Sequence, residues 1–156
     1  MCGIAGIIHR GKTVDIGSEM QGMLQALKHR GPDSTGYALY GEGSQGDYIL
    51  RFKVGENVKE GSTAANEEKA VYDERRKQVD KFIRDLGADI LQDQQLTPYS
   101  FRYVIKYDKD LMEFSKKIES VEMTEILSLG KTLELVKDIG DASVVSKQYG
   151  LDKIKG

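Results

Sequence analysis

The most reactive side chain in the sequence is that of Cys2, which follows Met1 and is the only cysteine of the chain. Removal of a methionine is favoured before a small residue, so we expect the mature protein to begin with a thiol and an α-amine on one residue. An α-amine titrates near ~7.7 to 8.0 and a thiol near ~8.5, so the amine can take the thiol proton near neutral pH. Cys2 is therefore a candidate nucleophile that carries its own base. The alternative is a buried thiol that behaves as a small apolar side chain, the commonest fate of a single cysteine.

Two glycine-rich stretches match nucleotide-binding patterns. Residues 6–13 satisfy the P-loop string G-x-x-x-x-G-K-T, but only five residues precede Gly6 and residues 14–17 are poor helix sequence. A P-loop needs a complete strand before it and a helix directly after it, so a P-loop NTPase remains a third alternative only. Residues 41–46 spell G-x-G-x-x-G, but a strand-like sequence follows, whereas a dinucleotide fingerprint opens a helix. We expect a hairpin loop there.

The elements that must position Cys2 can be read from the apolar pattern. The run 2–9 predicts a buried strand with Cys2 at its first position. Ser18 and Gln21 match a capping box, and apolar residues recur at helical spacing after them, so a helix is expected over 19–29. This helix should end at the Gly-Pro-Asp turn that follows it.

The next segments suggest a change of domain. Residues 37–40 and 48–54 are expected to form a hairpin across the glycine-rich loop between them. A polar, glycine-bounded stretch follows at 55–62, of the kind that links domains. We therefore expect two domains, residues 1–56 and residues 62–156.

The second domain is predicted to be a small αβαββα module. Its expected elements are a helix over 64–86, a strand over 99–107, a helix over 109–119, a hairpin of 126–129 and 132–136, and a helix over 141–149. Strand 99–107 has Tyr99, Phe101, Tyr103, Ile105 and Tyr107 at every second position, so one of its faces is largely aromatic. Such a face could stack nucleic-acid bases only beside a positive groove, so we expect it to be buried core.

Composition and charge exclude several partners. The 23 basic and 25 acidic residues give a formal net charge of −2, so neither nucleic acid nor an anionic membrane is an expected partner. The apolar opening is too short for a signal sequence or a membrane span, and a single cysteine allows no internal disulfide, which favours a cytoplasmic protein. Cys2, His9 and His29 do not form a zinc set. We expect no metal and no cofactor.

The opening together with residues 28–36, Lys-His-Arg-Gly-Pro-Asp-Ser-Thr-Gly, resembles the class II glutamine amidotransferases, which are N-terminal-nucleophile (Ntn) hydrolases. A Cys-Gly-Ile start, a helix, and then Arg-Gly-Pro-Asp with a small residue and glycine follow in that family's order. The chain is most similar to the archaeal glutamate-synthase-type glutaminase subunits, with asparagine synthetases next. The resemblance implies an α+β fold in which an incomplete first part of an Ntn αββα sandwich is followed by the αβαββα module as an insertion.

The same resemblance implies roles for three residues. In the family, the N-terminal cysteine attacks the carboxamide of glutamine, ammonia leaves, and water resolves the thioester to glutamate, so Cys2 matches the catalytic nucleophile. Arg30 and Gly31 match the Arg-Gly pair that packs beside it and are implied as positioning residues. The alternative is a turn, because Gly31-Pro32-Asp33 would be needed to reverse the chain whatever the function, although the turn itself needs no arginine. Glutamine is the implied substrate, and a synthase domain or subunit the implied acceptor of ammonia.

Other parts of the family's site do not match this sequence. It holds no Arg-x-Ala-Thr-His-Gly-type segment and no Asn-Gly pair for an oxyanion hole, since Asn57 and Asn66 are its only asparagines. Loss of one oxyanion donor typically costs ~10² to 10³ in turnover, so we expect a fragment or split subunit that needs the remainder of the amidotransferase domain and is nearly inactive alone. The alternative is a non-catalytic binding or regulatory module in which residues 62–156 do the work.

Overall fold

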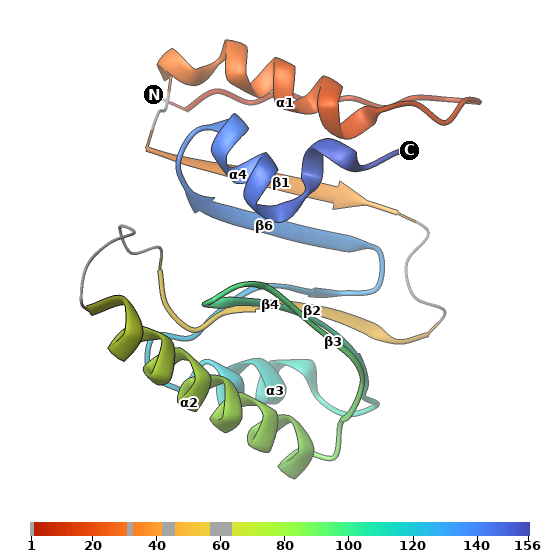
Figure 1. Ribbon diagram of the computed structural model, residues 1–156. Helices are drawn as coiled ribbons and strands as arrows, with labels where there is room; N and C mark the ends of the chain where they lie inside the picture. The colour runs from red at the N-terminus through yellow and green to blue at the C-terminus, as the bar shows by residue number, and fades with distance from the viewer. Residues whose placement is uncertain (1, 31–32, 42–45, 57–63) are drawn as a thin grey trace. The chain divides into compact units, whose positions relative to one another are not determined.

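Two antiparallel sheets and four α-helices make up the part of the chain that the computed structural model describes, which is residues 2–30, 33–41, 46–56 and 64–156 (Figure 1). The expected α+β class is confirmed. The elements in order are α1 (Ile16–Ala26), η1 (Lys28–Arg30), β1 (Ser34–Tyr40), β2 (Tyr48–Lys53), α2 (Ala64–Asp85), β3 (Asp89–Thr97), β4 (Ser100–Lys106), α3 (Leu111–Ile118), β5 (Glu125–Gly130), β6 (Leu133–Ile139), α4 (Ala142–Tyr149) and η2 (Leu151–Lys153).

The chain divides into two units. One combines Met1–Tyr37 with Lys137–Gly156 and is called the split unit below, and the other is Ala38–Val136, the central unit. Strands β1 and β6 pair with each other and lead the chain into and out of the central unit. Within the central unit, the Gly41 N–H donates to the Thr132 carbonyl at 3.1 Å, one residue beyond the end of β1 and one before the start of β6. The expected linker at 55–62 lies mostly outside the described residues, so the proposed boundary there stays a prediction.

The central unit has the connectivity of a split βαβ fold. Its sheet has the order β3-β4-β2-β5, and all neighbouring strands are antiparallel. Helix α2 connects β2 to β3, and β4 lies between these two strands in the sheet. Helix α3 connects β4 to β5, and β2 lies between those two. This interleaving of two βαβ units is the ferredoxin-like arrangement. Helices α2 and α3 cover the same face of the sheet (Figure 1).

Alternating side chains on the two middle strands build the core of this unit. The side chains that face the helices are almost fully buried, namely Leu50, Phe52, Val54, Phe101, Tyr103 and Ile105. The Phe52 ring stacks on Phe101 at 5.2 Å and meets Tyr103 edge-on at 5.1 Å. Helix α2 adds Val79 and Ile83 to this core. The expectation that the aromatic face of 99–107 is core is confirmed.

Several expected elements are confirmed and two pairings are wrong. The helices expected over 64–86, 109–119 and 141–149 correspond to α2, α3 and α4. The two expected hairpins are not formed, because β1 and β6 belong to one sheet whereas β2 and β5 belong to the other. Strand β2 is buried along almost its whole length, as suits an inner strand, whereas β1 is half exposed. Turn sequences alone could not reveal this difference.

The αβαββα module expected from the sequence has one strand fewer than the structure. Strand β3 was not expected, so the order after α2 is ββαββα and not βαββα. Residues 92–95 of β3 are Gln-Asp-Gln-Gln and are exposed at the edge of the sheet. An edge strand with two polar faces gives no alternating apolar signal.

In the split unit, the last residues of the chain lie against the start of α1. Val14 and Gly156 exchange two backbone hydrogen bonds, of 2.7 and 3.1 Å, and the Gly17 N–H donates to the Ile154 carbonyl at 3.0 Å. A Cβ at Gly17 would overlap the carbonyl oxygen of Leu151. The N-cap of α1 is Asp15 without a side-chain hydrogen bond, so the expected capping box at Ser18 and Gln21 is wrong.

Replacement of Gly17 by alanine tests this close approach. We expect Gly17→Ala to destabilise the chain by about 1 to 3 kcal/mol, because the added methyl group meets backbone that cannot move without shifting the C-terminal turn. Gly22 is the matched control, since it lies in the same helix with open space around it. Gly22→Ala should stabilise by about 0.5 to 1 kcal/mol through helix propensity. Urea unfolding measures both, and equal effects would refute the close contact.

Candidate functional site

The segment that carries Cys2 runs beside the C-terminal end of α1. Residues 2–10 form no strand among the described residues, and Cys2 is exposed, which contradicts both the expected buried strand and the buried-thiol alternative. A Cβ at Gly3 would lie 3.0 Å from Leu27 Cβ and 3.5 Å from Arg30 Cβ. The structure therefore brings the neighbour of Cys2 against Arg30, whereas Gly31 lies outside the described residues.

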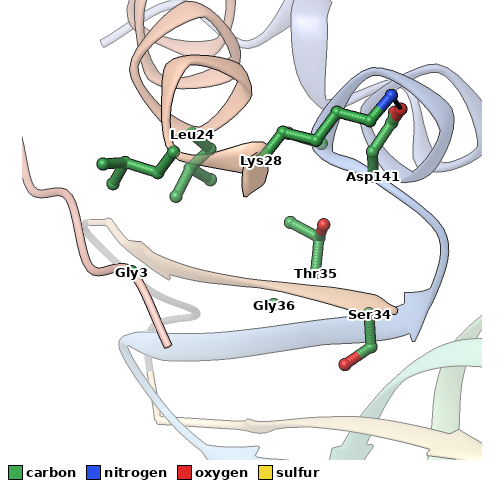
Figure 2. Close-up of a pocket in the computed structure, with 9 residues that line it drawn as sticks. Gly3, Leu24, Lys28, Ser34, Thr35, Gly36 and Asp141 are labelled. Atoms are coloured by element: carbon green, nitrogen blue, oxygen red, sulfur yellow. Dashed lines mark ion pairs between the residues drawn. The ribbon is translucent and has the colours of Figure 1, made fainter. Parts of the chain in front are cut away.

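A small cavity of about 80 Å³ opens beside Gly3 (Figure 2). It is lined by Gly3, by Leu24, Leu27 and Lys28 at the end of α1, by Ser34, Thr35 and Gly36 in β1, and by Asp141 and Ala142. In Figure 2, the Lys28 side chain reaches across to Asp141, while the Thr35 and Ser34 side chains point to opposite sides of β1. The cavity is smaller than pockets that enclose drug-sized ligands, but it has room for a small polar group.

An ion pair joins two walls of this cavity. Lys28 Nζ lies 2.7 Å from Asp141 Oδ2, and Asp141 also caps α4 by accepting from the Val144 N–H at 3.1 Å. The hydrogen bond from Lys28, followed by that from the Val144 amide, holds the pKa of Asp141 below its usual value. Gln25 Oε1 accepts from the Ser143 N–H at 3.2 Å. The end of α1 and the first turn of α4 are thus joined by two polar contacts.

Residues 140–142, which lead into α4, are also held by β1 and the residue before it. The Gly140 N–H donates to the Asp33 carbonyl at 3.1 Å, and Thr35 Oγ1 donates to the Gly140 carbonyl at 2.8 Å. The buried Tyr37 hydroxyl donates to the Ala142 carbonyl at 2.9 Å, and burial raises the pKa of Tyr37. Gly140 has φ +121°, a conformation that favours glycine. Residues 140–142 are therefore a firmly held wall of the cavity.

The wall formed by residues 140–142 was not expected from the sequence, although part of the pattern that predicts it was visible. The capped helix over 141–149 was expected, and Asp141 is its N-cap. Its position beside Lys28 depends on the pairing of β1 with β6, which joins segments about a hundred residues apart. The nucleotide-binding alternatives gain nothing from the structure: α1 begins at Ile16, not directly after residues 6–13, and strand β2 follows residues 41–46.

Two further polar networks lie within the central unit. The Glu134 carboxylate accepts from Arg51 Nε at 2.6 Å and from Arg102 Nε and Nη2 at 2.8 and 3.0 Å. Burial raises the pKa of Glu134, but the hydrogen bonds and charges of the two arginines outweigh it, so the pKa lies below its usual value. In the second network, Tyr103 donates to Asp80 and accepts from Arg76, both at 2.8 Å, and burial raises its pKa.

The Glu134 network should make stability depend on pH. Because the pKa of Glu134 is lowered by folding, its stabilisation is complete above the unfolded pKa, near ~4.3, and is lost as pH falls through the folded pKa. Glu134→Gln should cost about 3 kcal/mol at neutral pH, since it leaves the buried Arg51 and the half-buried Arg102 without a counter-charge, and should flatten the acid dependence. Urea unfolding as a function of pH measures both effects. The exposed Glu125→Gln is the control, with an expected change within about 0.5 kcal/mol.

The described residues show neither a membrane-spanning helix nor a metal-binding cluster. Among the helices of the described residues, none has the length and apolarity needed to cross a bilayer. The described side chains also include no group of three or more His, Cys, Asp or Glu residues arranged to hold a metal ion.

Comparison with known proteins relates the chain to glutamine-using enzymes. No family model matches it. A protein of Methanothermobacter thermautotrophicus named "Putative glutamine amidotransferase" is 29% identical over 161 residues, which cover 100% of this chain and 49% of that protein. A Methanocaldococcus jannaschii protein named as a putative glutamine-hydrolyzing asparagine synthetase is 55% identical over 40 residues, 26% of this chain and 8% of that protein.

These similarities support the amidotransferase resemblance at the level of the broad class. The chain is a homologue of a protein that is named as a glutamine amidotransferase. It spans about half the length of that relative.

Proposed function

We propose that this chain carries the nucleophile of a class II glutamine amidotransferase, in which Cys2 hydrolyses glutamine to glutamate and ammonia. The proposal is supported by the closeness of Gly3 to Leu27 and Arg30, where an added Cβ would lie 3.0 and 3.5 Å from their Cβ atoms, and by the cavity that Gly3 lines. The names of the two relatives, both of which refer to glutamine, support the substrate.

The chemistry needs only the groups of Cys2 for its proton transfers. With Met1 removed, the α-amine accepts the thiol proton, and the thiolate attacks the carboxamide carbon of glutamine. The tetrahedral intermediate collapses as the ammonium returns its proton to the leaving nitrogen, which departs as ammonia and leaves a thioester. The amine then takes a proton from water, whose oxygen attacks the thioester, and glutamate and the free thiol are released.

The surroundings of Cys2 supply positioning in this proposal. Arg30, whose Cβ lies near Gly3, is assigned a positioning role, and so is Gly31 from the motif alone. The Cys2 residue is exposed, so its thiol is accessible. The cavity beside Gly3 can take a group as small as a carboxamide, with the Thr35 hydroxyl at its side. The stabilisation of the oxyanion and the binding of the α-amino acid end are assigned to the remainder of the amidotransferase domain.

Ammonia is passed to a synthase domain or subunit in this proposal, and a glutamate-synthase-type partner is the first candidate. The assignment rests on the resemblance to glutaminase subunits of that type, while the asparagine synthetase name of the second relative supports a different acceptor. Glutaminase activity measured with 2-oxoglutarate or with aspartate, in the presence of the respective synthase, separates the two.

A regulatory or binding role is the second candidate function. Its support is the central unit, which has its own hydrophobic core and a ferredoxin-like connectivity independent of Cys2. Because one fold serves many functions, this observation names no ligand. An excised central unit that binds a regulator of the synthase, together with full function of a Cys2→Ala variant, would favour this role.

Labelling of the single thiol tests the nucleophile. We expect intact mass to show that Met1 is absent and that Cys2 is alkylated by iodoacetamide faster than an ordinary thiol near neutral pH, because the adjacent ammonium favours the thiolate. Glutathione at the same pH is the reference thiol. The control is a variant that retains Met1, in which the nitrogen of Cys2 is an amide and not a free amine. Retained Met1 in the native protein, or equal alkylation rates, would contradict the assignment.

A further inference from the structure

The face of the central sheet opposite to α2 and α3 carries two arginines side by side. Arg51 in β2 and Arg102 in β4 are direct cross-strand partners. The neighbours of Arg51 along β2, Leu50 and Phe52, face the helices, so Arg51 faces the other way. Like charges directly opposite each other destabilise a strand pair. The Glu134 carboxylate offsets this repulsion, because it accepts hydrogen bonds from both arginines.

The charges at this level of the sheet do not balance. Among the described residues, Glu134 is the only acidic side chain that forms an ion pair with either arginine. The outer cross-strand neighbours at the same level are uncharged, namely Gln94 beside Arg102 and Ser128 beside Arg51. Two guanidinium groups therefore share a single carboxylate, and one positive charge is left over on a mostly buried surface. Buried charges in proteins are normally paired.

Arg51 is the arginine with unused hydrogen-bond donors. Within the described part of the chain, its guanidinium donates only from Nε, to Glu134, whereas Arg102 donates from both Nε and Nη2. The N–H groups on Nη1 and Nη2 of Arg51 are thus available. The Arg51 side chain keeps 10% of its surface exposed, and neither Nη is among the fully enclosed atoms without a partner. A small ligand can therefore reach this end of the side chain from solvent.

A hydroxyl group lies beside Arg51 and adds a further donor. Ser128 in β5 is the register partner of Arg51 and faces the same side of the sheet. Its Oγ accepts from the Leu135 N–H at 3.0 Å, which leaves the hydroxyl proton free to donate. The position next to Glu134 thus combines a guanidinium fork, a hydroxyl and one excess positive charge. These features suit a ligand with acceptor oxygens and one negative charge.

We propose that Arg51 and Ser128 bind the carboxylate of a small molecule on this face of the central sheet. The two carboxylate oxygens accept from Nη1 and Nη2 of Arg51, and one of them also accepts from the Ser128 hydroxyl. A carboxylate neutralises the excess charge, whereas a phosphate dianion would leave a negative charge in its place at a cost in desolvation. The small exposed fraction of Arg51 admits a small molecule and not the face of another protein.

The proposed site does not depend on the catalytic role of Cys2. Both of its residues and Glu134 belong to the central unit, which has its own hydrophobic core. A ligand bound there would give the regulatory candidate function a chemical class, that of small carboxylates.

Titration of the chain with acetate, followed by NMR, tests the site. At constant ionic strength, maintained with chloride, the Arg51 Nε–H and Ser128 amide signals should shift and reach saturation. The half-saturating concentration should be on the order of 10 mM, as suits a single charge-assisted contact. Exposed arginines should give no saturation, because exposed ion pairs contribute little.

Three variants identify the donors. Arg51→Lys keeps the charge but loses the planar fork, so it should raise the half-saturating concentration at least about 10-fold. Ser128→Ala should raise it about 3-fold or more and leaves both arginines and Glu134 in place, so its effect cannot come from loss of their ion pairs. Arg84→Lys, at an exposed position of α2, is the matched control and should change nothing.

Three outcomes would overturn the proposal. Shifts that never saturate, or that chloride alone reproduces, would mean that no carboxylate site exists. Unchanged binding in both Arg51→Lys and Ser128→Ala would place acetate elsewhere on the molecule. Tighter binding of phosphate than of acetate, above neutral pH where phosphate is mainly a dianion, would contradict the charge match. None of these readouts measures glutaminase activity, so they leave the proposed function to its own test.

Discussion

The missing side chain of Gly17 allows a close backbone approach in the split unit. The first turn of α1 can touch the carbonyl of Leu151 only because position 17 has no Cβ, and the Gly17 amide then reaches Ile154. This contact fixes the last twenty residues of the chain against the first helix. The turn at residues 140–142 follows from the same placement, and with it the ion pair between Lys28 and Asp141. The cavity beside Gly3 therefore depends on a contact at the opposite end of α1.

Local signals in the sequence located most elements but not their neighbours. Helix α2 and strand β4 were predictable because each has a period that a single segment displays. Strand β3 was not, since its Gln-rich residues lie at a sheet edge and need no apolar alternation. The hairpin expected between β1 and β2 was wrong because a glycine-rich loop favours reversal of the chain without specifying which strands then pair.

The candidate site shows the same division between local and distant information. Cys2, Arg30 and Gly31 were singled out from two short motifs, and in the structure Gly3 lies near Arg30, whose Cβ would be 3.5 Å from a Cβ added at Gly3. Asp141 was expected only as the cap of a helix. Its proximity to Lys28 depends on backbone contacts such as that of Asp33 with Gly140, which no pattern in either segment reveals.

The hydrogen bond from Gly41 to Thr132 bears on how the chain could gain or lose the residues between them. It joins the residue that follows β1 to the residue that precedes β6, so these ends of the two strands are about one strand spacing apart. A short reverse turn could bridge them and leave β1 and β6 as an ordinary hairpin. Gain or loss of the ninety or so residues between them would need only such a turn to keep the chain continuous.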